Sequence, residues 1–233
     1  MSLLEVENVR YSSRAQEIIK GISLKIDAGE TVAIMGKSGS GKSSLLKLIA
    51  GILVPASGRA LFNGTDINLM NVAQNKAFRK KCAFMFQDAA LWANQDILSN
   101  LSLPLQIHFP EMKAKDRLLE ITNICKMVGY ERALSLRPAD LSMGEQKQVA
   151  FARAMICKPD VLFLDECTES LDKKGVQTIL ELLHDFEDSG RTMIYVTHSA
   201  AFEWEFSGRR IVLEDGMLSH DTGKLNGRTV NEV

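Results

Sequence analysis

The sequence lacks the features that mark a membrane-spanning or secreted chain. No stretch of about 18 apolar residues, the length needed to cross a bilayer, occurs in its 233 residues. The first thirteen residues carry acidic side chains where a signal peptide has a basic region and an apolar core. We therefore expect a protein that is neither exported nor membrane-spanning, and that acts at a membrane only as a peripheral subunit.

Excess charge and paired cysteines are also missing. The 28 Lys and Arg residues nearly balance the 29 Asp and Glu residues, so no strong field attracts nucleic acid, and no nucleic-acid partner is expected. The four cysteines, Cys82, Cys125, Cys157 and Cys167, form no C-x-x-C pair, which argues against a zinc site or disulfide framework. They indicate buried free thiols in a reducing compartment.

A glycine-rich segment, GKSGSGKSS, directly follows an apolar run of five residues and precedes a helical pattern. It matches G-x-x-x-x-G-K-S, with Gly36, Gly41, Lys42 and Ser43 at the specified positions, in the required order of strand, loop and helix. A glycine turn before an ordinary helix is the alternative. The context favours binding of a nucleoside triphosphate.

The backbone of this loop explains the prediction. Gly36, Gly39 and Gly41 allow conformations in which successive amides point at phosphate oxygens, and the helix start adds unpaired N–H groups. Lys42 supplies a charge for the β- and γ-phosphates, and the Ser43 hydroxyl can bind Mg²⁺. The residues expected to bind the triphosphate are Gly36, Lys37, Ser38, Gly39, Ser40, Gly41, Lys42, Ser43 and Ser44.

Two adjacent carboxylates, Asp165 and Glu166, follow the apolar run at 161–164. A continuous apolar strand is typical of a parallel sheet that is buried on both faces. In a phosphate-loop enzyme the first carboxylate can hold Mg²⁺ and the second can accept a proton from the attacking water. An acidic loop without function is the alternative, and the phosphate loop favours the catalytic interpretation.

Three further residues lie at or near strand ends, where ligands bind in open α/β sheets. Gln87 follows a predicted strand at 82–86, and His198 follows one at 192–197. Gln87 could equally bond a neighbouring loop, and a lone histidine is usually a surface residue. Tyr11 could stack on a bound purine or simply pack at the rim of a sheet.

Hydrophobic periodicity predicts the remaining elements. Residues 88–158 are expected to be mainly helical and broken into short pieces by Pro104 and Pro110. Ser142 with Glu145 has the spacing of a capping box, which predicts a helix start. The other expected strands are 3–11, 18–26, 31–35, 59–63, 161–165, 209–214 and 217–219, and the other expected helices are 71–81, 113–128 and 172–186.

Taken in order, these motifs resemble those of the nucleotide-binding subunits of ATP-binding cassette (ABC) transporters, over almost the full chain. The matching elements are GKSGSGKS, Gln87, the LSMGEQ segment before VLFLDE, the ESLD stretch at 169–172, and His198. The resemblance implies an α/β fold with a P-loop NTPase (RecA-like) core, an antiparallel β subdomain and a helical insert. Within a single ABC ATPase domain at 1–233, it implies the core plus β subdomain at 1–87 and 159–233 and the helical subdomain at 88–158.

The resemblance also implies roles. Tyr11 would stack on adenine, and Ser43, Gln87 and Asp165 would organise Mg²⁺. Glu166 would be the general base, and His198 would contact the γ-phosphate. Two subunits would pair head to tail, so that Ser142, Gly144 and Glu145 of one complete the ATP site of the other, with Asp172 at the interface.

The signature segment departs from the usual family pattern, LSGGQ. Met143 replaces a glycine, Glu145 replaces a glutamine, and Gln148 stands where arginine is frequent. Met143 adds bulk, and Glu145 brings a carboxylate toward the partner's nucleotide. We expect activity to survive because Ser142 and Gly144 remain.

The leading hypothesis is an ATPase subunit at the cytoplasmic face of the membrane that powers an integral membrane permease as one of a pair of ATP-binding subunits, expected to be a homodimer. An apolar groove for a helix of that partner would be formed by Leu91, Trp92, Ile97, Leu98, Leu101 and Leu103, and core packing of the helical insert is the alternative for most of these side chains. The strings FQDAALW and NLSLPL are similar to those of lipid-handling cassettes of the mammalian-cell-entry type, although amino-acid, metal and lipoprotein systems share much of the pattern. A soluble cassette ATPase and a P-loop small-molecule kinase are the alternatives.

Overall fold

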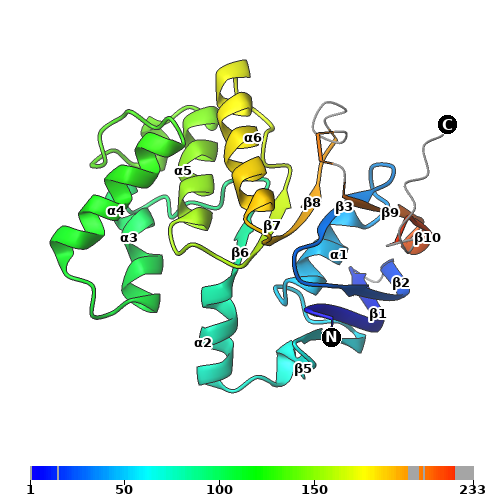
Figure 1. Ribbon diagram of the computed structural model, residues 1–233. Coiled ribbons are helices and arrows are strands. Elements are labelled where there is room, and N and C mark those ends of the chain that lie inside the picture. Colours follow the sequence, from blue (N-terminus) through cyan, green and yellow to red (C-terminus); the bar gives the residue numbers. More distant parts are fainter. Residues whose placement is uncertain (1, 15, 199–204, 207, 224–233) are drawn as a thin grey trace. The chain divides into compact units, whose positions relative to one another are not determined.

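The computed structural model describes residues 2–14, 16–198, 205–206 and 208–223. Packing divides the chain into two compact units, each described separately below (Figure 1). The first unit comprises residues 1–70 and 193–233, and the second comprises residues 71–192. Among the described residues, no helix is both long and apolar enough to span a bilayer.

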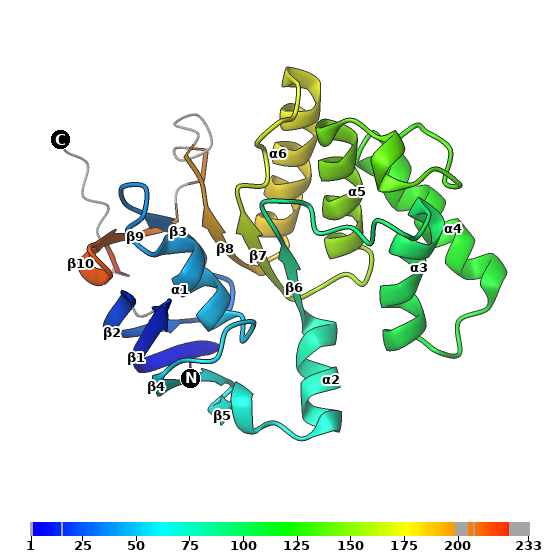
Figure 2. The same ribbon diagram turned by 180° about the vertical axis from the view of Figure 1, so that it is seen from behind.

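The first unit contains an antiparallel sheet with the strand order β2-β1-β4-β5 (Figure 2). Alternating apolar residues of β1 and β2, such as Val6 and Leu24, bury one face of this sheet. The bounds are β1 (Leu4–Ser13), β2 (Gln16–Ile26), β4 (Ser57–Phe62) and β5 (Thr65–Asp66), followed by a 3₁₀ turn at Ile67–Leu69.

A second group of strands in the first unit has the order β10-β9-β3-β8. The strands β9, β3 and β8 are parallel, and β10 pairs antiparallel with β9. The bounds are β3 (Thr31–Met35), β8 (Thr192–Val196), β9 (Arg209–Glu214) and β10 (Met217–Asp221). Helix α1 (Lys42–Ile49) packs on β1, β2, β3 and β4 through buried leucines such as Leu45 and Leu48.

The second unit is mainly helical (Figure 2). Helices α3, α4 and α5 pack against one another. The bounds are α2 (Val72–Lys81), α3 (Ile97–His108), α4 (Ala114–Met127), α5 (Met143–Met155) and α6 (Lys173–Asp188), with a 3₁₀ turn at Pro138–Asp140. Two parallel strands complete the unit, β6 (Cys82–Met85) and the fully buried β7 (Val161–Asp165).

The expectation that Pro104 breaks the helical segment is wrong. Pro104 lies inside α3, which continues to His108. Proline removes one backbone hydrogen bond, but Leu101 and Leu105 on either side of it are buried in the core. Tertiary packing therefore holds the helix together across the proline.

Candidate active site

The phosphate loop leaves β3 through backbone shapes that only glycine fits. Gly36 has φ of 139°, and a Cβ built there would lie 2.3 Å from the carbonyl oxygen of Leu213. Gly41 has φ of 100° and caps α1, and its Cβ would lie 2.8 Å from Cδ1 of Ile19. The glycine pattern found in the sequence is therefore required by this path of the chain.

Two polar side chains of the phosphate loop, Ser40 and Lys42, are buried. Lys42 is buried, and its ammonium donates to the carbonyl oxygens of Gly36 at 2.9 Å and Lys37 at 3.0 Å. The buried Ser40 hydroxyl has no hydrogen-bond partner within the described part of the chain. Lys37, Ser38 and Gly39 are exposed, and Ser43 and Ser44 are half-buried in the first turn of α1. The loop thus presents a cation, a free hydroxyl and a helix start to one small region.

Tyr11 and His198 belong to the same unit as this loop. Tyr11 is half-buried and pairs across the sheet with Ile19, the residue that approaches Gly41. His198 is exposed and lies two residues beyond β8, which pairs in parallel with β3. Because parallel strands end at the same edge, His198 follows the edge from which the phosphate loop also departs.

In the second unit, β7 delivers the two carboxylates. Asp165 is fully buried at the end of the strand. Glu166 follows with φ of 52° and 7% exposure. A left-handed conformation at a residue other than glycine costs on the order of 1–3 kcal/mol and persists only where neighbouring contacts impose it.

Gln87 lies two residues beyond β6, the parallel neighbour of β7. Its amide nitrogen donates to Oε2 of Glu169 at 3.2 Å. The strand pairing therefore places Asp165 at the end of one strand and Gln87 just beyond the end of the adjacent strand. Both interpretations of Gln87 remain compatible with this arrangement, since it bonds a loop residue at the edge where ligands bind.

Ser142 caps α5 and is exposed, as the capping-box spacing predicts. Its hydroxyl accepts the Glu145 backbone N–H at 3.2 Å and lies 3.0 Å from Glu145 Oε2. The Ser142 N–H and hydroxyl, and then Arg132 at 2.9 Å, hold the pKa of Glu145 below its ordinary value. Met143 is 52% exposed beside this helix start.

The other two residues expected near a partner have contacts of their own. Asp172 caps α6, where its Oδ1 accepts the N–H of Gly175 at 2.7 Å. A Cβ built on Gly144 would lie 3.0 Å from the carbonyl oxygen of Ser170. The start of α5 therefore packs closely on the loop between β7 and α6.

Sequence reasoning missed two cations of α5. Lys147 is 1% exposed and donates to the carbonyl oxygen of Glu166 at 2.9 Å. Burial lowers its pKa, which the nearby Cys167, Glu169, Glu166 and Asp165 partly offset. The signal was present, because Lys147 has helical spacing to Ala150, Phe151 and Ala154, all of which are buried.

The second missed cation is Arg153, whose guanidinium donates to the carbonyl oxygens of Ala89 and Ala90, both at 2.9 Å. Both alanines have positive φ, 60° and 48°. One side chain thus holds two consecutive strained residues just after Gln87. Nothing in the local sequence marks this contact.

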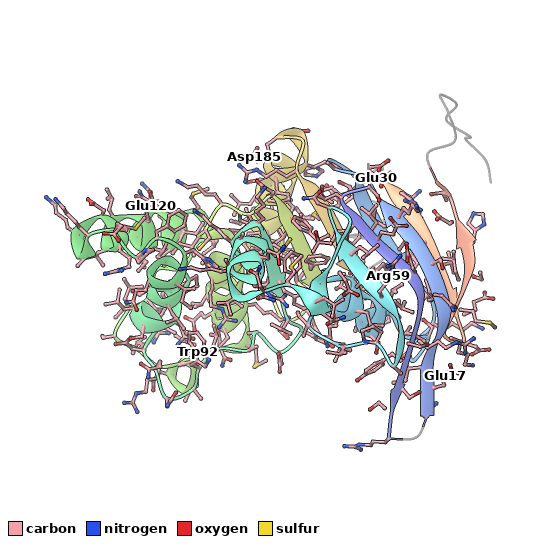
Figure 3. All side chains as sticks on the ribbon, turned by 90° about the horizontal axis from the view of Figure 1, so that it is seen from below. Glu17, Glu30, Arg59, Trp92, Glu120 and Asp185 are labelled. Atoms are coloured by element: carbon pink, nitrogen blue, oxygen red, sulfur yellow. The ribbon has the colours of Figure 1, made fainter. Side chains whose placement is uncertain are left out.

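The expected groove is only partly apolar. Ile97 and Leu101 are fully buried in the core, so their side chains do not line a surface. Trp92, labelled in Figure 3, is 42% exposed. A depression there is lined by Trp92, Asn94, Gln95, Leu98, Ser99, Ser102, Leu103 and Gln106, which mixes polar and apolar side chains.

The glycine loop on β3 with α1, and the paired carboxylates on a buried parallel strand, define a P-loop nucleoside triphosphatase. Residues 19–169 match the family model described as ABC transporter. The chain belongs to the ATP-binding proteins of the ABC transporter family, and is an ATPase of that family. The family and the fold class expected from the sequence are confirmed.

Named relatives extend over nearly the whole chain. It is 32% identical to the arginine/ornithine transport ATP-binding protein AotP of Pseudomonas aeruginosa, covering 94% of this chain and 89% of AotP. It is 34% identical to the histidine/lysine/arginine/ornithine transport ATP-binding protein HisP of Salmonella typhimurium, covering 94% and 88%. A dimeric, post-hydrolysis structure of the cassette MJ0796, bound to ADP and Pi, is 31% identical with a TM-score of 0.85, covering 94% and 97%.

Proposed function

We propose that this chain is the ATP-hydrolysing subunit of an ABC transporter, and that it pairs with a second ATP-binding subunit to move a substrate through an integral membrane permease. The observation that carries the proposal is the loop at 36–44. Its glycine-dependent path, the buried Lys42 and the unpartnered Ser40 hydroxyl suit the phosphates of ATP.

The side chains expected to bind the cofactor suit it chemically. The Ser43 hydroxyl, the Gln87 amide oxygen and the Asp165 carboxylate are hard oxygen ligands of the kind that Mg²⁺ prefers. When bound, Mg²⁺ would neutralise charge on the phosphates. Glu166 would accept the proton of the attacking water, and His198 would contact the γ-phosphate. Tyr11 would stack on the adenine ring.

The exposed start of α5 supports the proposed pairing of subunits. Ser142 and the first amides of this helix would bind an anion such as a phosphate. A nucleotide held by the phosphate loop of one subunit and by Ser142, Gly144 and Glu145 of another favours the closed pair, with Asp172 at the interface. Ligand-driven closure requires this kind of differential affinity. The dimeric form of the MJ0796 cassette supports the proposal.

The membrane partner, rather than this chain, would determine which substrate is transported. AotP and HisP are named for basic amino acids, which favours an amino-acid or related solute over a lipid. The surface around Trp92 and the helical segment 88–158 would receive the permease. The protein would then lie at the cytoplasmic face of the membrane as a peripheral subunit.

Two measurements distinguish the transporter subunit from the alternative functions, a soluble cassette ATPase and a small-molecule kinase. Co-purification with integral membrane proteins from detergent extracts supports a transporter, and recovery without them supports a soluble cassette ATPase. A phosphorylated small molecule, rather than free phosphate, as product would support a kinase.

Hydrolysis itself is tested with Glu166→Gln and Lys42→Ala. Glu166→Gln should lower ATP turnover by about 10²–10⁴-fold, the range for a lost general base, with ATP binding retained. Lys42→Ala should weaken binding, seen as loss of the ATP-dependent rise in melting temperature. Near-normal turnover of Glu166→Gln would remove Glu166 from the proposed role.

A further inference from the structure

The loop that carries Glu166 lies against helix α5 at more than one point. Lys147 donates to the carbonyl oxygen of Glu166 at 2.9 Å. A Cβ built on Gly144 would lie only 3.0 Å from the carbonyl oxygen of Ser170. Glu166 and Ser170 both have positive φ, 52° and 68°. Helix α5 therefore bonds one of these strained residues, Glu166, and lies close against the other, Ser170.

A buried lysine such as Lys147 is unusual at a contact that only stabilises the fold. It is 1% exposed, and burying an ammonium group is unfavourable unless its charge and donors are used. The groups around it are Asp165, Glu166, Cys167 and Glu169, three of them carboxylates. Glu169 in turn accepts a hydrogen bond from Gln87. Two of these groups, Asp165 and Glu166, are expected to act on ATP.

We propose that Lys147 is a positioning residue for hydrolysis: by holding the Glu166 carbonyl, it fixes the left-handed backbone that aims the Glu166 carboxylate at the attacking water. The inference rests on the proposed function, since it requires Glu166 to be the base. Lys147 itself contacts no substrate in this account. It links the helix begun by Ser142 to the catalytic loop, so a nucleotide held at that helix start would be coupled to the base.

The test uses Lys147→Met, which has a similar length but neither charge nor donor. The Glu166 carbonyl keeps a turn contact from the Glu169 N–H at 3.4 Å, so it is not left without a donor. We expect kcat to fall about 10²-fold, as for a misplaced catalytic group, with the KM for ATP unchanged. The melting temperature should fall, because the buried Asp165 and Glu166 carboxylates lose a nearby cation, but ATP should still raise it.

The matched control is Gln148→Met on the same helix. Gln148 is half-buried and bonds the carbonyl oxygen of Gly129, away from the catalytic loop. Its turnover should match the unmodified protein. If Lys147→Met does not fold, Lys147→Gln replaces it in the comparison. This variant loses the charge but keeps a donor, and its kcat should fall about tenfold.

The double variant Lys147→Met/Glu166→Gln shows whether Lys147 acts through Glu166. We expect it to be no slower than Glu166→Gln alone, because the group that Lys147 positions is already gone. A further loss as large as that of the single Lys147 variant would overturn the inference, as would normal kcat in Lys147→Met or a joint loss of melting temperature and ATP binding. Near-normal turnover of Glu166→Gln would instead overturn the proposed base.

Discussion

The guanidinium of Arg132 lies 2.9 Å from Oε1 of Glu145. The other carboxylate oxygen of Glu145 accepts the N–H of Ser142 at 2.8 Å. Glu145 therefore bridges Arg132 to the start of α5 and keeps its charge at the helix end proposed to meet a partner's nucleotide.

Replacing Glu145 by Gln should promote pairing. Glutamine preserves the capping box but removes a carboxylate that repels phosphate. In a Glu166→Gln background, the ATP concentration for half-maximal dimer formation should fall roughly two- to fivefold, as expected for an interaction between exposed charges. Chemical crosslinking at increasing ATP measures this.

Arg132→Gln is the control, because it breaks the ion pair and leaves the carboxylate in place. It should require as much ATP as the parent or more. Unchanged or weaker pairing in Glu145→Gln would refute the repulsion.

Arg153 should be needed for the conformation of the segment after Gln87. A lysine lacks the guanidinium fork that donates to the carbonyls of both Ala89 and Ala90, so Arg153→Lys should leave one of these two contacts unmade. The free energy of unfolding should fall by about 1–3 kcal/mol in urea titrations.

The companion variant Ala90→Gly relieves the positive φ at that position and should leave stability unchanged or raise it. An Arg153→Lys variant as stable as the parent would show that the two carbonyls do not depend on the guanidinium.

The Asp221 carboxylate should stabilise the protein in a pH-dependent way. Two hydrogen bonds from Arg209, at 2.7 and 2.6 Å, hold the pKa of Asp221 below its ordinary value of 3.8. The folded state thus prefers the charged form, so the contribution is fully present above pH 3.8 and is lost as pH falls through the lowered pKa.

Asp221→Asn should therefore lower the free energy of unfolding at pH 7 by about 1.5–3 kcal/mol, as for hydrogen bonds to a charged group. The difference between variant and parent should shrink below pH 3.8. A difference that is constant with pH would contradict the assignment to ionisation.

The four thiols should be unreactive in the folded protein. Burial raises the pKa of Cys82 and Cys167 to about 12, and that of Cys125 and Cys157 to about 11, so almost no thiolate exists at pH 8. Ellman's reagent should react slowly with native protein, first at the half-buried Cys157, and with all four thiols in denaturant. Rapid labelling of any thiol in native protein would contradict this burial.

Local patterns predicted the parts of the fold that depend on neighbouring residues. The alternation in β1 and β2, the glycines of the phosphate loop and the Ser142–Glu145 capping box all act within a few residues, and the structure contains each of them. Pro104 shows the limit, because local propensity favours a break and packing of Leu101 and Leu105 overrides it.

The parts of the site that escaped prediction join distant segments. Lys147 meets Glu166 across 19 residues, and Arg153 meets Ala89 across 64. Neither pair has a local signature, although a lysine on the apolar face of α5 was a visible anomaly. The sequence also contains a polar tail at 222–233 that we expect to be mobile or docked on a partner, and this expectation falls, from residue 224 on, outside the described residues.

The central claim, that ATP holds two subunits together through Ser142, is tested most directly by light scattering of the Glu166→Gln protein. The account predicts that the mass of this protein doubles when ATP is added. When Ser142→Glu is combined with Glu166→Gln, the mass should no longer double, although ATP should still raise the melting temperature. A mass that stays monomeric at saturating ATP, or a dimer that persists in the Ser142→Glu variant, would contradict it.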